Sequence, residues 1–281
     1  MKNDSTTECG GRRLKGTFAT GSVDQPLVTV VTAVYNGKTN IAGCLESVLA
    51  QDYPLVEHIL LDAGSKDGTV DVLREYDDRI AFWRSEPDTG IYDAWNKALE
   101  EARGEWICFL GVDDHLLPGA VSAYMAMALK NPQAEYISSR VKVVDPSGYR
   151  RTIGGPWSWR RFSKRMCTAH PGSMHRRELY NRLGTYDTSY RIVADYEFLL
   201  RARWQLNAVY MPTVTVIMQD GGVSCTRQAL EEQARAKRVT GGRSKLLTAM
   251  ELKIANLKFS LRPLRYAWGR LLARSSDSGT H

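Results

Sequence analysis

Two adjacent carboxylates, Asp113 and Asp114, follow directly after an apolar run that reads EWICFL at residues 105–110. Like charges side by side repel each other, so their position at the end of a buried strand makes chemical sense if a divalent cation neutralises them. Carboxylate oxygens suit Mg²⁺ or Mn²⁺, and these ions complete their coordination with substrate phosphates. A solvated turn that caps the next helix is the competing interpretation, because an Asp-Asp pair alone is a weak motif.

Two further turns join a predicted strand to a predicted helix. The segment SEPDTGIYDAWNK at residues 85–97 places Asp88 near a helix start, where free N–H groups favour an anion, although Asp88 could equally cap the helix. The segment DAGSKDGT at residues 62–69 contains Asp67, which is most simply a cap. Asp62 ends the strand and is placed to hydrogen-bond a nucleobase or a ribose.

Several common chemistries lack their motifs in this sequence. Residues 36–39 (NGKT) resemble the end of a P-loop, but the first glycine of that motif would fall at Thr32 inside a strand. No GxGxxG follows a predicted strand, and the histidines include neither HExxH nor a recognisable Ser-His-Asp elbow. Hydrolase and dinucleotide-dependent oxidoreductase functions are therefore disfavoured.

The elements that must position these residues alternate between strand and helix. Buried apolar runs predict strands, and apolar residues at intervals of three and four predict helices. The predicted strands are residues 27–35, 57–62, 79–84 and 105–110, and the predicted helices are residues 38–50, 67–76, 91–103 and 118–131. This alternation indicates an α/β fold with a mostly parallel sheet flanked by helices. Ligands bind such sheets outside the carboxyl ends of the strands, where the acids above lie.

The composition is that of a globular chain, with 43% hydrophobic and 25% charged residues among 281. No apolar run approaches the roughly 18 residues of a membrane span. Residues 1–25 are polar and lack the apolar stretch of a secretory signal, so we expect a disordered leader there. The five cysteines are odd in number and none has CxxC spacing, which favours a reducing cytoplasm over a disulfide framework or a zinc site.

The net charge of +7 is concentrated at one end of the chain. Residues 225–281 carry 12 Lys and Arg against 4 Asp and Glu, whereas the preceding residues carry 26 against 27. The nearly neutral body disfavours nucleic acid as a partner, and the basic tail needs its own explanation.

The tail has an amphipathic helical pattern over residues 244–274, broken or kinked at Pro263. Its apolar positions are Leu247, Met250, Ile254, Leu257, Leu261, Leu264, Trp268 and Leu271. Basic residues on the remaining surface are typical of a helix that lies on a membrane. The alternative is that the stripe packs on the catalytic domain or on a second subunit in a homodimer.

Four segments, in order, resemble the family-2 glycosyltransferases, which are inverting enzymes with the Rossmann-like GT-A fold, and in particular the bacterial members that build cell-surface polysaccharides. The segments read VTVVTAVYN, LLDAGSKDGT, EPDTGIYDAWNKAL followed by GEWICFLGVDD, and RIVADYEFLLR. The expected organisation is a leader (1–25), a catalytic domain (26–224) and a basic amphipathic helical tail (225–281). Within the catalytic domain we expect a nucleotide-sugar half (26–117) and an acceptor half (118–224).

The resemblance implies roles for the residues at the strand ends. Tyr35 matches an aromatic residue that stacks on the nucleobase, and Asp62 and Asp88 match acids that contact the nucleoside. Asp114 matches a direct ligand of Mg²⁺ or Mn²⁺, with Asp113 nearer the ribose and diphosphate. Many family members carry a second acid after the position of Asp62, where this chain has alanine, and this leaves the role of Asp62 open.

The resemblance also implies the catalytic base. Asp195 matches the carboxylate that removes the proton of the acceptor hydroxyl, whereas the sequence alone would favour a helix cap. His170, Trp157 and Trp159 are candidates for the acceptor site, with structural packing as the alternative for each.

The sequence therefore predicts a metal-dependent enzyme that transfers a hexosyl or N-acetylhexosaminyl group from a nucleotide sugar, by family habit a UDP-sugar. The expected acceptor is a carbohydrate or a lipid-linked glycan in polysaccharide or glycolipid assembly, at the cytoplasmic face of the membrane. A sugar-1-phosphate nucleotidyltransferase is one alternative, but the loop after the first strand has a single glycine. The other is a non-catalytic nucleotide-sugar-binding scaffold, against which the intact Asp114 and Asp195 argue.

Overall fold

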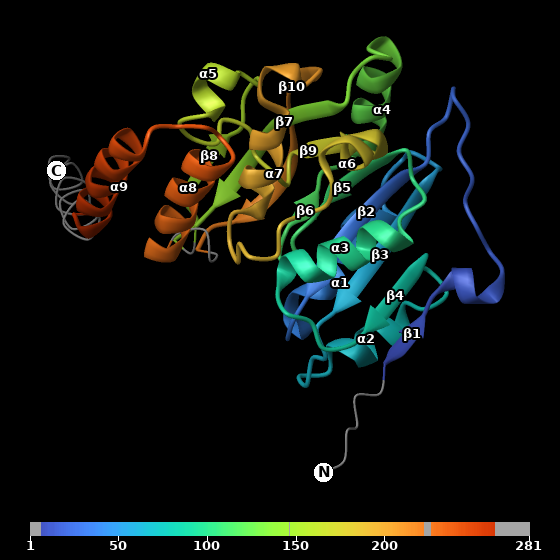
Figure 1. Ribbon diagram of the computed structural model, residues 1–281. Helices are drawn as coiled ribbons and strands as arrows, with labels where there is room; N and C mark the ends of the chain where they lie inside the picture. The colour runs from blue at the N-terminus through green and yellow to red at the C-terminus, as the bar shows by residue number, and fades with distance from the viewer. Residues whose placement is uncertain (1–6, 146, 222–225, 262–281) are drawn as a thin grey trace, which may run out of the picture.

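The structure, a computed structural model, describes residues 7–145, 147–221 and 226–261 (Figure 1). The strands are β1 Glu8–Gly10, β2 Val28–Val34, β3 Val56–Asp62, β4 Phe82–Ser85, β5 Trp106–Phe109, β6 His115–Leu116, β7 Tyr136–Val144, β8 Arg150–Ile153, β9 Ser173–Arg176 and β10 Ala208–Gln219. The α-helices are α1 Lys38–Leu49, α2 Thr69–Glu75, α3 Ile91–Glu101, α4 Ala120–Lys130, α5 Trp159–Phe162, α6 Arg177–Leu183, α7 Ala194–Ala202, α8 Arg227–Val239 and α9 Lys245–Ser260. Two short 3-10 helices are η1 Arg12–Lys15 and η2 Arg203–Gln205.

One sheet joins all the strands of the described residues, in the order β1-β4-β3-β2-β5-β9-β7-β10-β6, with β8 paired to β7. β4, β3, β2 and β5 run parallel, as the repeated strand-helix alternation predicts. β9 then lies antiparallel between β5 and β7, so the second half of the sheet is mixed. The predicted α/β class, a sheet flanked by helices, is confirmed.

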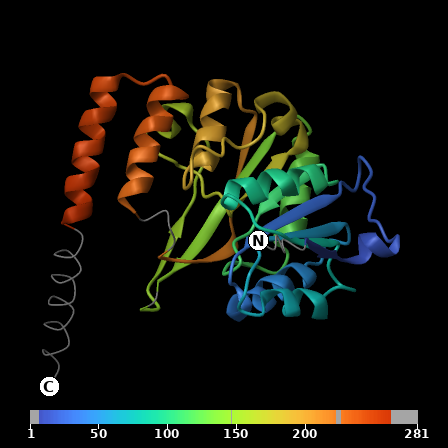
Figure 2. The same ribbon diagram turned by 60° about the horizontal axis from the view of Figure 1, so that its bottom comes forward.

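Helices cover both faces of the sheet (Figures 1 and 2). β2 shows how its sequence produces this arrangement, because successive side chains of a strand point to opposite faces. Val31 packs in the cluster formed with α3, α6 and α7, whereas Val30 packs in the cluster formed with α1 and α4. The continuous apolar run of β2 is therefore the sequence of a strand buried on both sides.

The prediction of a disordered leader over residues 1–25 is wrong for its described part, which excludes residues 1–6. β1 pairs with the edge strand β4, and Arg13 is buried in an ion pair with Glu57. The carboxylate of Glu57 also accepts hydrogen bonds from Thr29 Oγ1 at 2.6 Å and from the backbone N–H groups of Arg103 and Gly104 at 2.6 and 3.1 Å. Arg13 thus neutralises a buried carboxylate that ties β2 and β3 to the end of α3, a role that local composition could not reveal.

At the other end of the chain, α8 and α9 form a helical hairpin at the side of the domain (Figure 2). α9 begins where the tail pattern predicts a helix, while the part of that pattern from residue 262 onward, including Pro263 and Trp268, lies outside the described residues. α8 lies within the expected helical tail of residues 225–281 but before the amphipathic pattern of residues 244–274. None of the helices in the described part of the chain has the length and apolar character that a membrane crossing needs.

Arg13→Ala should lower the free energy of unfolding by about 3 kcal/mol or more, since removing one partner of a buried ion pair leaves the other charge unpaired. Lys15→Ala is the matched control, because Lys15 contacts Asp77 and Asp78 from a largely exposed position and its loss should change stability little. Urea unfolding followed by circular dichroism measures both variants. Equal effects of the two substitutions would show that the N-terminal segment does not stabilise the sheet.

Candidate active site

The carboxyl ends of β2, β3 and β4 open onto a cavity of about 470 Å³. Its lining consists of Ala33, Val34, Tyr35, Ala63, Pro87, Asp88, Gly90 and Ile91. Tyr35 presents an exposed aromatic ring at this cavity, and Ile91 begins α3 on the same cavity wall. The structure therefore brings two of the predicted donor-binding residues, Tyr35 and Asp88, into one cavity of the size that small-molecule sites have.

The loop after β2 is held by the loop after β3. Asn36 has a left-handed backbone with a φ of 50°, which asparagine tolerates better than most residues. Its N–H donates to Ser65 Oγ at 2.7 Å, and its side-chain oxygen accepts from the N–H of Lys66 at 3.1 Å. These hydrogen bonds fix the conformation of the turn that contains Tyr35.

Asp62 lies beneath this cavity, 1% exposed. Its Oδ2 accepts hydrogen bonds from the N–H groups of Gly64 at 3.1 Å and Ser65 at 3.0 Å and from Ser85 Oγ at 2.6 Å, while its Oδ1 accepts from Ser65 Oγ. The carboxylate therefore orders the loop after β3 and joins it to the end of β4. A contact between Asp62 and a nucleoside stays a prediction, and the contacts within the protein already account for its burial.

Asp88 and Asp93 accept hydrogen bonds from the backbone of the segment that leads into α3. Asp88 Oδ1 accepts from the N–H of Gly90 at 2.9 Å, and Asp93 Oδ2 accepts from the N–H of Thr89 at 3.0 Å. Partial burial raises the pKa of Asp88 above its usual range. Asp88 thus stabilises the turn before α3 and lines the cavity, while the N-cap of α3 is Gly90 and has no side-chain cap.

The acid pair lies between β5 and β6. Asp114 is 4% exposed, and its Oδ1 accepts a hydrogen bond from the N–H of Gln219, at the end of β10, at 3.2 Å. Burial, together with the charge of Asp113, raises the pKa of Asp114 to about 7. No Lys, Arg or His side chain in the described part of the chain forms an ion pair with either acid, so their repulsion is not relieved by the protein.

Gly111 allows both carboxylates to approach the same stretch of backbone. A Cβ atom at Gly111 would lie 2.8 Å from Asp114 Oδ2 and 3.1 Å from Asp113 Oδ1. The described residues contain no cluster of three or more His, Cys, Asp or Glu side chains suited to a metal ion. Two carboxylates nevertheless fit Mg²⁺ or Mn²⁺, because these ions commonly use one or two protein carboxylates and complete their shell with water and substrate phosphate.

The acid pair and the cavity lie at the same edge of the sheet. A Cβ atom at Gly37 would lie 2.9 Å from Val112 Cγ2 and 2.5 Å from Val34 Cγ2. The loop that carries Tyr35 therefore touches the loop that carries Asp113. This close approach leaves no room for a larger residue than glycine at position 37 without a shift of the loops.

Asp195 lies in the first turn of α7, partly exposed, beside the start of α3. The hydroxyl of Tyr92 lies 3.1 Å from Asp195 Oδ1 and 2.7 Å from the carbonyl oxygen of Ile192. Tyr92 follows Gly90 and Ile91, which line the cavity. The predicted base is thus attached, through one buried tyrosine, to the helix that forms a wall of the cavity.

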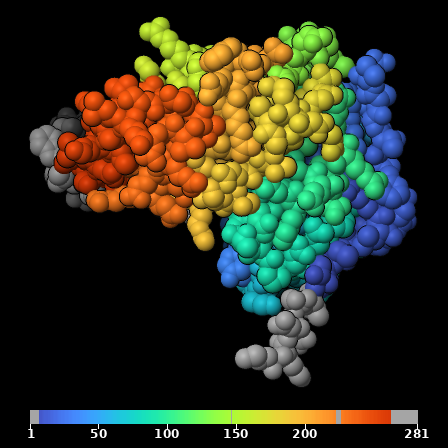
Figure 3. Space-filling view, in the orientation of Figure 1, coloured from blue at the N-terminus to red at the C-terminus, as the bar shows by residue number. Residues whose placement is uncertain are grey.

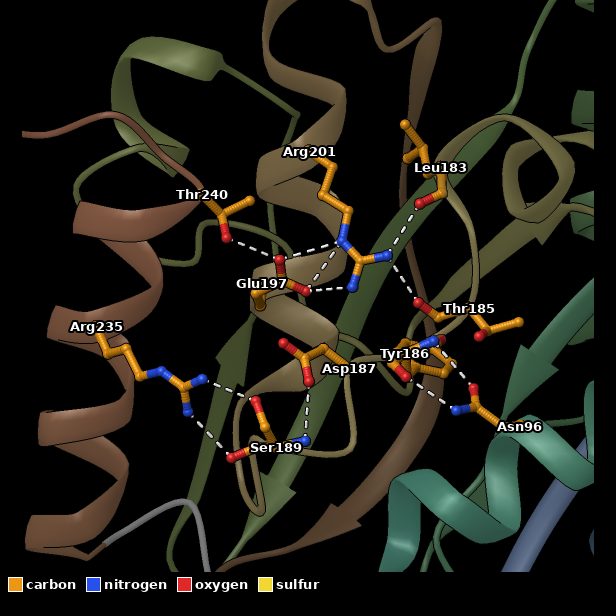
Figure 4. Close-up of polar contacts among 10 residues, drawn as sticks. All are labelled: Asn96, Leu183, Thr185, Tyr186, Asp187, Ser189, Glu197, Arg201, Arg235 and Thr240. Carbon is orange, nitrogen blue, oxygen red and sulfur yellow. Dashed lines mark hydrogen bonds and ion pairs between the residues drawn. The ribbon is translucent and has the colours of Figure 1, made fainter.

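Two polar side chains that the sequence analysis missed hold the segment before α7. Glu232 of α8 accepts hydrogen bonds from the N–H groups of Arg191, Ile192 and Val193 at 3.2, 2.8 and 3.3 Å. Asn96 of α3 exchanges two hydrogen bonds of 2.9 Å with the backbone of Tyr186 (Figure 4). The sequence places these partners about 40 and 90 residues apart, and no local pattern indicates such contacts.

Glu197, the other acid of the same turn, is buried and paired with Arg201 (Figure 4). It also accepts from Thr240 Oγ1 at 2.8 Å, while Arg201 donates to the carbonyl oxygens of Leu183 and Thr185 at 2.9 and 2.7 Å. This network joins α7 to the end of α8 and to the loop after α6. Glu197 is therefore part of the scaffold, and Asp195 is the acid of this turn that remains partly exposed.

The three residues proposed for the acceptor site contribute to aromatic packing. His170 is buried, and its ring stacks on Trp95 with a centroid separation of 4.9 Å and an interplanar angle of 6°. Burial lowers the pKa of His170, and the charge of Asp195 opposes this shift. Trp157 packs on Phe162 at 4.3 Å, and Trp159 is partly buried against the same core. The contacts favour the packing interpretation, and acceptor contacts by these residues stay predictions.

The parallel βα half has a cavity at its strand ends, an acid pair beside that cavity and a carboxylate, Asp195, linked to the cavity wall through Tyr92. This arrangement is that of a glycosyltransferase of the GT-A type. The chain belongs to Glycosyl transferase family 2, whose sequence signature matches residues 29–184. That range contains Tyr35, Asp62, Asp88 and the acid pair, and it ends before Asp195.

Curated relatives agree with this assignment. An uncharacterised glycosyltransferase of Mycobacterium tuberculosis is 33% identical over 208 residues, which cover 72% of this chain and 79% of that protein. The PGL/p-HBAD biosynthesis glycosyltransferase of Mycobacterium bovis is 28% identical over 210 residues, covering 72% of this chain and 80% of its own length.

Solved structures support the fold. Staphylococcus aureus TarS (residues 1–349) in complex with UDP has a TM-score of 0.62 at 17% identity, covering 80% of this chain and 68% of that one. A mannosyltransferase from Pyrobaculum calidifontis in complex with GDP-Man and Mn²⁺ has a TM-score of 0.62 at 20% identity, covering 96% of this chain and 86% of that one. Together with family membership, these similarities confirm the predicted GT-A fold.

Asp114→Asn should stabilise the metal-free protein, and the gain should grow with pH. The pKa of Asp114 is about 7 in the fold, above its ordinary value of 3.8, so ionisation of this residue disfavours the folded state once the pH exceeds the ordinary value. The gain should be small at pH 4 and on the order of 1 to 3 kcal/mol at pH 8. Urea unfolding at both pH values in the presence of a chelator measures it.

The same variant should lose stabilisation by Mn²⁺ plus a nucleoside diphosphate, which adds about 2.7 kcal/mol to a competent site at 100 times Kd. Asp78→Asn is the control, because Asp78 is highly exposed and pairs with Lys15 away from the cavity. An Asp114→Asn protein that keeps the full Mn²⁺-dependent stabilisation would exclude Asp114 as a ligand.

Proposed function

We propose that this chain transfers a sugar from a nucleoside diphosphate sugar to an acceptor hydroxyl, with inversion at the anomeric carbon and with Mg²⁺ or Mn²⁺ as cofactor. The observation that carries the proposal is the hydrogen-bond distance between Asp195 and Tyr92, which ties a partly exposed carboxylate to the wall of the cavity at the ends of β2, β3 and β4. Family membership supplies the reaction class, and this contact supports the choice of base.

The donor is proposed to occupy the cavity, with its nucleobase against Tyr35 and its ribose near Asp88. Tyr35 is 66% exposed in the structure, so a stacked base would cover a ring that otherwise faces water. A UDP-sugar is the proposed donor, supported by the fold relationship to TarS, which has been solved with UDP. Hexosyl and N-acetylhexosaminyl donors both fit this proposal, and thermal stabilisation by individual sugar nucleotides would distinguish them.

Asp113 and Asp114 would hold the divalent cation. When bound, the cation supplies charge stabilisation for the diphosphate leaving group. The raised pKa of Asp114 supports this assignment, since a carboxylate that is disfavoured by burial and by its neighbour gains most from a nearby positive charge.

Asp195 is proposed as the general base. It accepts the proton of the acceptor hydroxyl, the hydroxyl oxygen forms a bond to the anomeric carbon, and the bond to the diphosphate breaks with its electron pair leaving on oxygen. One displacement by one base inverts the configuration. Tyr92 beside Oδ1 leaves Oδ2 for the acceptor, and Glu232 holds the backbone that precedes the base.

The acceptor is proposed to be a carbohydrate or a lipid-linked glycan in cell-surface glycoconjugate assembly. The support is that a relative is named for PGL/p-HBAD biosynthesis. Family membership removes the nucleotidyltransferase alternative. A non-catalytic scaffold is distinguished by measuring UDP release from UDP-sugars in the presence of acceptor extracts, because a scaffold releases none.

Asp195→Asn should bind donor and Mn²⁺ with unchanged affinity and lose transfer by roughly 10²- to 10⁴-fold, the usual contribution of a positioned base. The amide keeps the size of the carboxylate but cannot take the hydroxyl proton. Asp145→Asn, in an exposed turn, is the control and should keep full turnover. Near wild-type turnover of the Asp195 variant would place the base elsewhere, and a parallel loss of donor affinity would indicate a structural role.

Tyr92→Phe should lower the turnover number by roughly fivefold at unchanged donor affinity, because one hydrogen bond, worth about 1 kcal/mol, no longer orients the base. Tyr53→Phe is a matched control, since the Tyr53 hydroxyl donates to the carbonyl oxygen of Pro26 at 2.7 Å at the opposite end of β2. Both substitutions remove a tyrosine hydroxyl that bonds to the backbone, and only the first should affect turnover. Equal turnover of the two variants would remove Tyr92 from the mechanism.

A further inference from the structure

α9 exposes large apolar side chains along its outer face. They are Leu246, Leu247, Met250, Ile254, Leu257 and Leu261, each between 43% and 71% exposed. At 3.6 residues per turn, these positions fall within one sector of about 100° along the whole helix. We call this set the α9 stripe, and its continuity distinguishes it from the single apolar residues found on most protein surfaces.

The opposite side of α9 is packed, so the stripe is not the result of an undocked helix. Thr248 is buried on that side, and Glu251 lies 3.4 Å from the ammonium of Lys237 in α8. The guanidinium of Arg227 lies over the ring of Phe259 at 5.8 Å. α8 and α9 thus form a lobe at one end of the molecule (Figure 3).

Positive charge borders the α9 stripe on both sides. Helical geometry places Lys253 on one flank and Lys258 on the other, and both are exposed. The single acid in the sequence of α9, Glu251, is engaged with Lys237 and Arg243 on the packed side. The outer face therefore combines apolar side chains with lysines and presents no carboxylate.

We propose that the α9 stripe binds an anionic lipid surface, with the apolar side chains at the boundary of headgroups and acyl chains and with Lys253 and Lys258 at the level of the phosphates. Long lysine side chains allow this arrangement, because the stem can follow the apolar face while the ammonium stays in the polar layer. The charge pattern favours lipid over a second copy of the chain. A two-fold contact through the stripe would bring lysine flanks together without any acid to pair them.

The fold connects this surface to the acceptor side of the site. α9 packs on α8, and Glu232 of α8 holds the segment that carries Asp195. A protein bound to a membrane through the α9 stripe would therefore have the same lobe anchored to lipid and in contact with the segment of the base. Lipid binding by this face does not depend on the proposed transfer reaction.

The test uses the full chain and flotation with vesicles of phosphatidylcholine, with and without phosphatidylglycerol. The wild-type protein should bind the anionic vesicles, and binding should weaken as salt is raised. Ile254→Gln with Leu257→Gln should abolish flotation. Lys253→Gln with Lys258→Gln should weaken binding about 30-fold, the conversion of roughly 1 kcal/mol for each lysine near an anionic surface.

Leu129→Gln is the matched control, because Leu129 is similarly exposed but lies on α4. It should bind vesicles as the wild type does. If the Ile254/Leu257 variant unfolds, the Lys253/Lys258 variant still tests the proposal, provided that its thermal melting is the same as that of the wild type. Failure of the wild type to float with anionic vesicles, or full binding by a folded stripe variant, overturns the proposal. The proposal is also overturned, in favour of a second copy of the chain, if the wild type is a dimer in sedimentation equilibrium, the stripe variant is a monomer, and the wild type does not bind lipid.

Discussion

The parallel register of β2, β3 and β4 is the constraint on which the cavity proposed for the donor depends. It pairs Val34 with Asp62 and Asp62 with Ser85, so three successive strands end at one level. The carboxylate of Asp62 then spans the ends, accepting from the Ser85 hydroxyl and from the loop after β3. Tyr35 and Asp88 face one cavity because their loops leave the sheet at this common edge. A shift of one residue in either pairing would turn the side chains of the shifted strand to the other face of the sheet, and Asp62 and Ser85 would no longer lie side by side.

The acid pair lies at the same edge of the sheet, but its buried charge is compensated much less than that of Asp62. Asp62 is satisfied by donors of the protein, whereas Asp114 is also buried, has backbone donors only, and has a negative neighbour. Such a group costs stability when it is ionised, and nothing in the described residues compensates for it. A buried carboxylate that the protein does not compensate breaks the rule that buried charges are paired, and such exceptions are expected at functional sites. The contrast between the two carboxylates therefore separates scaffold from candidate chemistry without reference to any relative.

The sequence allowed prediction of the parts that depend on local pattern. β2 and β5 are mostly apolar runs, β3 has an apolar centre, and the rule that ligands bind at strand ends was sufficient to select Tyr35, Asp88 and Asp114 for inspection. The parts that depend on long-range pairing could not be predicted. Arg13 in an otherwise polar leader is buried because Glu57, 44 residues away, needs a cation. Glu232 in a highly charged helix looks like a surface acid until α8 is placed against residues 191–193.

Three elements distant in sequence converge on the segment that carries Asp195, the proposed base. α3 reaches it through the Tyr92 hydroxyl and through Asn96, α8 through Glu232, and α7 through the Glu197–Arg201 pair that ties the helix to the loop after α6. A base must keep its position while an acceptor enters beside it, and contacts to several rigid elements provide this better than one loop can. Since α3 also lines the cavity proposed for the donor, displacement of Asp195 relative to that cavity would require breaking contacts to α3 itself. The geometry between that cavity and Asp195 is therefore set by one helix, α3, whose start lines the cavity and whose Tyr92 and Asn96 hold the segment before and at the start of α7.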